Sequence, residues 1–157
     1  MITTLSLDQS TRITGYAIFQ EDKLVKVDQF ELTDSNIGTR LKKYKEKILK
    51  LIDENGVNQV LFEEIQLQQN VETFKKLAMV YGTTMLLLEV KNIKYDIISS
   101  NTWKSKCKIK KTGRETEKKA AQSFVEKEYG IRVSQDKADA ICLGYSQLKK
   151  PDYNWTD

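Results

Sequence analysis

The order of the apolar segments limits the fold of this chain more than any other feature of its sequence. Strand-like segments are expected at residues 2–8, 14–20, 24–32, 57–64 and 95–99. Helical spacing of apolar residues is found at residues 39–54, 71–90, 115–129 and 135–149. Three consecutive strands followed by alternating helices and strands predict an α/β fold, with a mixed five-stranded sheet flanked by helices.

The length of 157 residues suits one domain with a substantial core. No repeat, low-complexity segment or linker divides the chain, so we expect one domain over residues 1–150 and a short tail at 151–157. No run approaches the roughly 20 apolar residues of a membrane helix, and the first ten residues lack the plan of a signal peptide. We therefore expect a cytoplasmic protein.

The chain contains no histidine, which limits its possible chemistry. Ser-His-Asp and Cys-His catalysis and nearly every zinc site are excluded. The two cysteines, Cys107 and Cys142, have no metal-ligand spacing and are expected to be free thiols. A catalytic metal would need oxygen ligands, which favours Mg²⁺ or Mn²⁺.

Carboxylates stand at the ends of several predicted elements. Asp8 ends the first strand, and Glu63 and Glu64 end the fourth. Asp136 and Asp139 lie on one face of the last helix, which has Ser134 as its expected N-cap. If these elements meet, divalent ions would offset the carboxylate repulsion and promote phosphodiester hydrolysis. Spacing alone also allows a turn at Asp8, a solvated strand end, and acidic residues that favour a helix dipole.

A basic segment leads into the predicted helix at 115–129. Residues 104–119 hold eight basic side chains against two acidic ones, and the basic ones are Lys104, Lys106, Lys108, Lys110, Lys111, Arg114, Lys118 and Lys119. We expect them to contact DNA phosphates, although a solvated, mobile loop is the alternative. The basic run at 40–50 is interpreted as the solvated face of an amphipathic helix. Trp103 could stack on a base or pack in the core.

Three motifs resemble those of the RuvC-type Holliday-junction resolvases. They are LSLDQSTRITGYAIF at 5–19, VLFEEIQ at 60–66 and QDKADAICLG at 135–144, in the family's order. The resemblance implies a ribonuclease H-like fold. It also implies that the metal ligands are Asp8, Glu63, Asp136 and Asp139, with Glu64 as the alternative to Glu63.

The same resemblance implies a function. Lys104 and Lys118 match lysines near the scissile phosphate, so Lys118 is also expected to be catalytic. The family works as a two-fold dimer that nicks four-way DNA junctions and leaves 5′-phosphates. The helix at 71–90 is apolar on more than one face, so we expect a homodimer through it, although a helix buried within one subunit is the alternative.

Two positions depart from the family pattern. Ser10 replaces a usual glycine, and Gln66 stands near an aromatic residue thought to help open the junction. Both concern substrate preference, so forks and flaps are also possible substrates. The alternatives are a branched-DNA-binding protein that does not cut, a ribonuclease H for RNA–DNA hybrids, and, from LDQST, a sugar-kinase-like ATPase. The small, lysine-rich chain suits a bacteriophage member.

Overall fold

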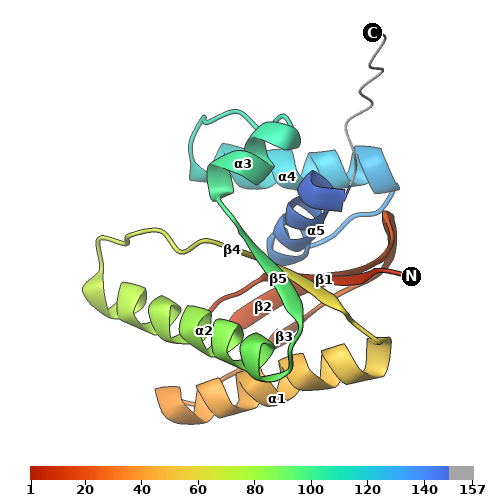
Figure 1. The fold of residues 1–157 in the computed structure, drawn as a ribbon. Helices are drawn as coiled ribbons and strands as arrows, with labels where there is room; N and C mark the ends of the chain where they lie inside the picture. The colour runs from red at the N-terminus through yellow and green to blue at the C-terminus, as the bar shows by residue number, and fades with distance from the viewer. Residues whose placement is uncertain (149–157) are drawn as a thin grey trace, which may run out of the picture.

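The computed structural model describes residues 1–148, so the predicted tail at 151–157 lies outside the described residues. The strands are β1 (Thr3–Asp8), β2 (Ile13–Gln20), β3 (Lys23–Glu31), β4 (Gln59–Glu63) and β5 (Lys94–Ile98). The helices are α1 (Ile37–Asn55), α2 (Val71–Val90), α3 (Ser100–Lys106), α4 (Arg114–Tyr129) and α5 (Gln135–Leu148). Figure 1 shows these elements as a sheet with helices on both faces.

The five strands form one mixed sheet in the order β3-β2-β1-β4-β5. β2 pairs antiparallel with both β1 and β3, and a turn with Glu21 at φ 53° joins β2 to β3. β4 runs parallel to β1 and to β5, with a helix in each connection. The predicted mixed five-stranded sheet is confirmed, and β1 and β4 are neighbours as the carboxylate hypothesis requires.

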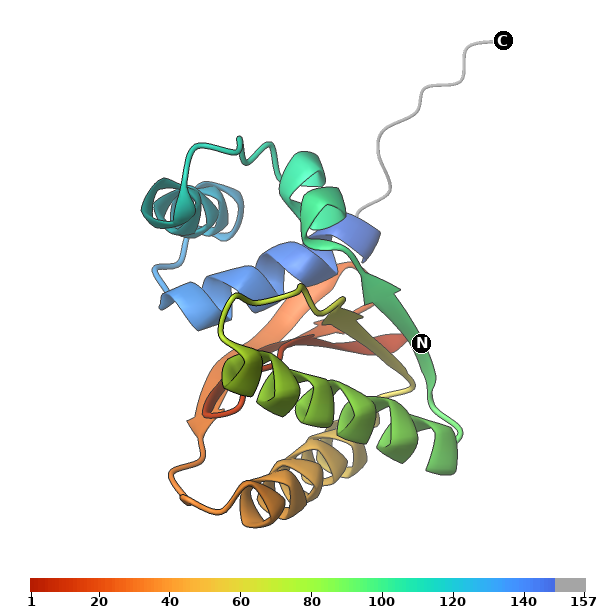
Figure 2. The same cartoon turned by 90° about the vertical axis from the view of Figure 1, so that its left-hand side faces the viewer.

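Strand alternation creates two separate cores, one on each face of the sheet. Helices α1 and α2 cover one face, and α5, backed by α3 and α4, covers the other (Figures 1 and 2). The core under α1 and α2 contains the large side chains Leu5, Leu7, Tyr16, Ile18, Val60, Phe62 and Leu88. The core under α5 contains Ala17, Phe19, Leu61, Trp103, Ala138, Ala140 and Ile141.

One helix was missed by the pattern of apolar residues. No helix was predicted between β5 and α4, but the first part of this segment forms α3, with Ser99 Oγ accepting a hydrogen bond from the Thr102 amide at 3.1 Å. Seven residues are too few to establish a helical period, so this cap was the only local signal. The predicted Ser134 cap of α5 is confirmed, since its hydroxyl accepts from the Lys137 amide at 3.4 Å.

Across residues 1–148, no helix has both the length and the apolar character required to span a bilayer.

Candidate active site

The ends of β1 and β4 bring two of the predicted carboxylates to the same edge of the sheet. The parallel register pairs Leu7 with Phe62, so Asp8 and Glu63 are the next residues on neighbouring strands. Because side chains alternate along a strand, both leave the sheet on the side that α5 covers. Ser6, two residues before Asp8, confirms this face, since its hydroxyl donates to the Ala140 carbonyl at 2.7 Å.

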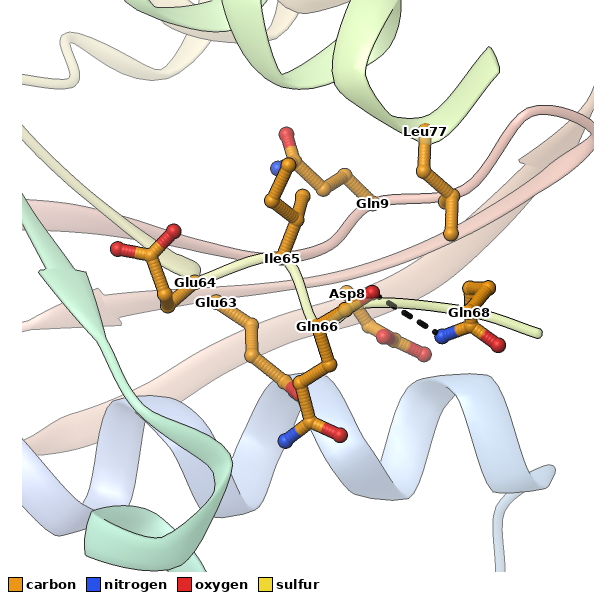
Figure 3. A pocket seen from close by; sticks show the side chains of 8 residues that line it. All are labelled: Asp8, Gln9, Glu63, Glu64, Ile65, Gln66, Gln68 and Leu77. Carbon is orange, nitrogen blue, oxygen red and sulfur yellow. Dashed lines mark hydrogen bonds between the residues drawn. The ribbon is translucent and has the colours of Figure 1, made fainter. Parts of the chain in front are cut away.

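Glu63, the last residue of β4, and Glu64, the residue after it, point in opposite directions (Figure 3). Glu63 points towards α5 and accepts a hydrogen bond at Oε2 from the Trp103 indole at 3.1 Å. Glu64 is exposed on the other side of the sheet, beside Tyr81. The burial of Tyr81 and its hydrogen bond to Glu64 raise the pKa of Tyr81 to about 12. The structure therefore brings Glu63, and not Glu64, to the predicted cluster.

Helix α5 lies close to the sheet because glycine occupies the contact point. Gly15 pairs with Asp8 across β1 and β2, and a Cβ added at Gly15 would lie 2.2 Å from the Asp136 carbonyl oxygen. Any larger residue would push the start of α5 away from β2. The TGY part of the first motif thus sets the position of Asp136 and, one turn later, of Asp139.

Electrostatic interactions among the four predicted carboxylates shift the pKa values of Asp8 and Asp139. Burial, followed by the carboxylates of Asp139 and Glu63, holds the pKa of Asp8 well above its usual value. Asp136 adds to this shift through its charge and a side-chain hydrogen bond to Asp8. The pKa of Asp139 is raised to about 7, first by burial and then by Glu63, while Lys104 opposes the shift. The structure therefore brings these four side chains within electrostatic reach of one another.

Helix α3 supplies two side chains to this cluster. Burial raises the pKa of Glu63, whereas the Trp103 hydrogen bond and the Lys104 charge lower it. Lys104 also forms an ion pair with Glu117 at 3.7 Å. Trp103 is only 2% exposed, so the interpretation of Trp103 as a base-stacking residue is wrong and the core alternative holds.

A cleft of about 470 Å³ opens beside the carboxylates. Its lining includes Lys104, Arg114 and Lys118 from the basic segment, together with Asp8, Glu63 and Asp139. The other predicted DNA-binding residues do not line the cleft and are exposed to solvent: Lys106, Lys108, Lys110, Lys111 and Lys119. The basic segment therefore has a part that reaches the carboxylates and a part that faces solvent.

The cleft also contains residues that sequence reasoning did not select. Glu117, Gln68 and Ser100 line it. Of these, only Glu117 had a signal in the sequence, its position next to the predicted catalytic residue Lys118. A smaller pocket of about 130 Å³ adjoins it and shares Asp8, Glu63, Gln66 and Gln68 (Figure 3). In this pocket the side-chain Nε2 of Gln68 donates to the backbone carbonyl of Gln66 at 3.4 Å.

The donor set suits a hard divalent cation. The cluster offers only carboxylate oxygens, which Mg²⁺ and Mn²⁺ prefer. Within residues 1–148, however, no group of three or more acidic, thiol or imidazole side chains is already arranged to hold a metal ion. Side-chain rotations change the distances between such ligands without changing which groups share the space. The residues fit a metal whose binding would complete their arrangement.

Comparison with known families assigns the chain. The family model described as crossover junction endodeoxyribonuclease RuvC matches residues 4–145. The chain belongs to the RuvC family. No curated protein matches it.

Solved structures of RuvC-type resolvases share this fold. RuvC of T. thermophilus in complex with a Holliday junction substrate is 11% identical over 92% of each chain, with a TM-score of 0.76. The yeast mitochondrial Holliday junction resolvase is 14% identical over 92% of this chain and 77% of its own, with a TM-score of 0.60. Fowlpox virus resolvase, with substrate Holliday junction DNA, is 15% identical over 94% and 93%, with a TM-score of 0.58. The predicted ribonuclease H-like fold is confirmed.

Proposed function

We propose that this RuvC-family protein is a metal-dependent endonuclease that resolves Holliday junctions and other branched DNA, leaving 5′-phosphates. The observation that carries the proposal is the convergence of Asp8, Glu63, Asp136 and Asp139 beside a cleft with basic residues. The T. thermophilus and fowlpox virus structures, which contain Holliday junction DNA, support the choice of substrate.

In this proposal the four carboxylates hold Mg²⁺, or Mn²⁺ in its place. When bound, the metal supplies Lewis acidity to the phosphodiester and activates a water. Without it, burial and the neighbouring carboxylates hold the pKa of Asp8 well above its usual value and raise that of Asp139 to about 7. Metal binding would therefore release protons from this cluster.

The chain's own residues position the DNA and balance its charge. Lys104, Arg114 and Lys118 line the same cleft as the carboxylates, so they would neutralise the phosphate at the cut. In the hydrolysis, the water oxygen bonds to phosphorus and the bond from phosphorus to O3′ breaks. The attacking water loses a proton and the departing O3′ takes one up, so the upstream strand ends in a 3′-hydroxyl and the phosphate stays on O5′ of the downstream nucleotide.

A cleavage assay with Asp8→Asn tests the proposal. We expect the wild-type protein to cut a labelled four-way junction in Mg²⁺ or Mn²⁺. Asp8→Asn should bind it but cut on the order of 10⁴-fold more slowly, the size expected when one member of a catalytic unit is removed. Ligation of the nicked strands by a DNA ligase would verify the 5′-phosphates.

The substrate panel separates this proposal from its rivals. Forks, flaps, linear duplex and an RNA–DNA hybrid are tested beside the junction. Binding without cutting by the wild-type protein would establish a DNA-binding module, and preferred cutting of the hybrid would establish a ribonuclease H. Either result would overturn the resolvase assignment.

We also propose that the protein acts as a homodimer through the outer face of α2. Met79, Leu86 and Val90 are 41%, 66% and 72% exposed on this helix, a large apolar display. Pairing with a second copy would bury them and present two clefts to opposite strands of a junction. Light scattering should show a dimer that Leu86→Lys converts to a monomer. A wild-type monomer at micromolar concentration with full cleavage would refute this role.

A further inference from the structure

Trp103 lies between the core under α5 and the carboxylate cluster. Its ring is 2% exposed and belongs to the same core as Ile98, Cys107 and Val125. The indole Nε1 donates to Glu63 Oε2 at 3.1 Å. A side chain that is otherwise part of the hydrophobic core therefore places its one polar atom against the cluster.

We propose that Trp103 is a positioning residue for Glu63. Its N–H fixes Oε2 of the carboxylate of Glu63, a residue that lines the cleft together with Asp8 and Asp139. The inference rests on the proposed function, in which Glu63 is a metal ligand. It adds a residue of α3, outside the three sequence motifs, to the machinery of the site.

The physical need for such a partner comes from the position of Glu63. Glu63 is the last residue of β4, and exposed residues follow it, so the strand alone does not fix the orientation of its long side chain. A flexible glutamate loses rotamer entropy when it is held in one geometry. A rigid, buried indole that is already ordered by the core supplies this constraint before metal binds.

Two properties of the indole N–H favour its hydrogen bond to Glu63. An indole N–H is only a donor, so it holds a carboxylate oxygen without competing for a cation. A buried N–H without an acceptor would also destabilise the fold, which favours the observed contact.

The next residue on α3 reinforces this arrangement. Lys104 Nζ lies 5.5 Å from the centre of the Trp103 ring and 3.7 Å from Glu117. Consecutive residues of α3 thus engage two acidic side chains of the cleft, Glu63 and Glu117.

An isosteric replacement tests the role of the N–H. Benzothienylalanine at position 103 replaces the indole N–H by sulfur while keeping the ring volume. We expect Mn²⁺ binding, measured by calorimetry, to weaken about 10-fold, the lower end of the usual effect of losing an outer-shell partner. Val125→Ala is the matched control because it opens a cavity in the same core on α4. It should lower the melting temperature and leave Mn²⁺ affinity unchanged.

A second measurement does not depend on cleavage. In a Trp155→Phe background Trp103 is the only tryptophan, and its ¹⁵N-labelled indole gives one NMR resonance. We expect this resonance to move upfield in Glu63→Gln, because a neutral amide is a weaker acceptor, and to shift when Mg²⁺ is added. The Glu64→Gln variant should leave it in place.

The outcomes separate this inference from the proposed function. Wild-type Mn²⁺ affinity in the benzothienylalanine protein, or an indole resonance indifferent to Glu63→Gln, would overturn the positioning role. A protein that binds Mn²⁺ as expected but cuts no branched DNA would defeat the proposed function and leave the positioning role standing.

Discussion

The two faces of the sheet are built from side chains of different size. Under α1 and α2 the core is made of leucine, isoleucine, tyrosine and phenylalanine, which bury the most apolar surface. Under α5 the closest contacts are small, as at Gly15 against the Asp136 backbone and Ser6 against Ala140. These small contacts allow α5, which carries Asp136 and Asp139, to lie close to β1, which carries Asp8.

The faces also differ in how they treat polar groups. Gln9, the residue after Asp8, points to the α2 face, where its Oε1 accepts from Thr84 at 2.8 Å (Figure 3). Thr84 is in turn 2.8 Å from the Tyr44 hydroxyl, so this face holds a neutral network. The α5 face instead gathers carboxylates that raise the pKa of Asp8. Two consecutive residues, Asp8 and Gln9, therefore belong to a carboxylate cluster on one face and to a neutral hydrogen-bond network on the other.

The largest expected contrast compares Glu63, the last residue of β4, with Glu64, the residue after it. Glu63→Gln should lower the rate of junction cleavage on the order of 10³-fold or more, because it removes a charge from the cluster on the α5 face. Glu64→Gln, on the α2 face, should change the rate less than about 3-fold, since surface substitutions have small effects. Single-turnover rates on a labelled junction measure both. Equal losses in the two variants would erase the functional difference between the faces.

Two glycines allow the packing difference to be tested directly. Gly15→Ala should lower the free energy of unfolding by about 1–3 kcal/mol, because its Cβ would overlap the Asp136 backbone. It should also reduce cleavage, because α5 carries Asp136 and Asp139 away from Asp8. Gly82→Ala in α2 is the control, since an added Cβ has no neighbour within 4 Å. It should stabilise the helix by about 0.5–1 kcal/mol. Urea unfolding compares the variants, and a harmless Gly15→Ala would contradict the close approach.

The basic residues give a smaller contrast between the two sides. Changing Lys108, Lys110 and Lys111 together to glutamine should make DNA affinity less dependent on salt. The slope of log affinity against log salt concentration should fall in magnitude by about 0.9 for each phosphate that these lysines neutralise in the wild type. Lys42, Lys45 and Lys47 are also exposed, but on α1 across the sheet, and their triple glutamine variant should keep the wild-type slope. Binding is measured over a salt series, and equal slopes for all three proteins would place the DNA elsewhere.

The smallest expected effect is on stability as a function of pH. The pKa of Asp139 is raised to about 7, so the metal-free folded state holds a proton that the unfolded state has released. The contribution of the Asp139 carboxyl group to the free energy of unfolding is therefore complete below about pH 4. It is lost as the pH rises to about 7. Asp139→Asn should melt at a higher temperature than the wild type above that range and depend less on pH. Glu46→Gln, exposed on α1, should keep the wild-type profile. A parallel profile for Asp139→Asn would contradict the raised pKa.

Local sequence patterns predicted most of the elements. The alternating apolar residues of β1 and β2 and the cap of α5 act over a few residues, so they can be recognised without the fold. Helix α3 was missed because seven residues show no period, and part of the basic run at 40–50 was misread. Arg40 in that run is 2% exposed and donates to the Thr11 carbonyl at 3.2 Å, a partner that no local pattern shows.

The sequence by itself determined the chemistry available to this protein: acidic side chains at strand and helix ends, no imidazole, and a lysine-rich segment. Only the tertiary structure decided which of these side chains act together. It separated Glu63 from Glu64, brought Lys104 and Lys118 but not Lys106 to the cleft, and placed Trp103 against Glu63. The physical reason is that residue type and spacing act along the chain, whereas contacts between distant segments depend on strand register and on how closely α5 approaches the sheet.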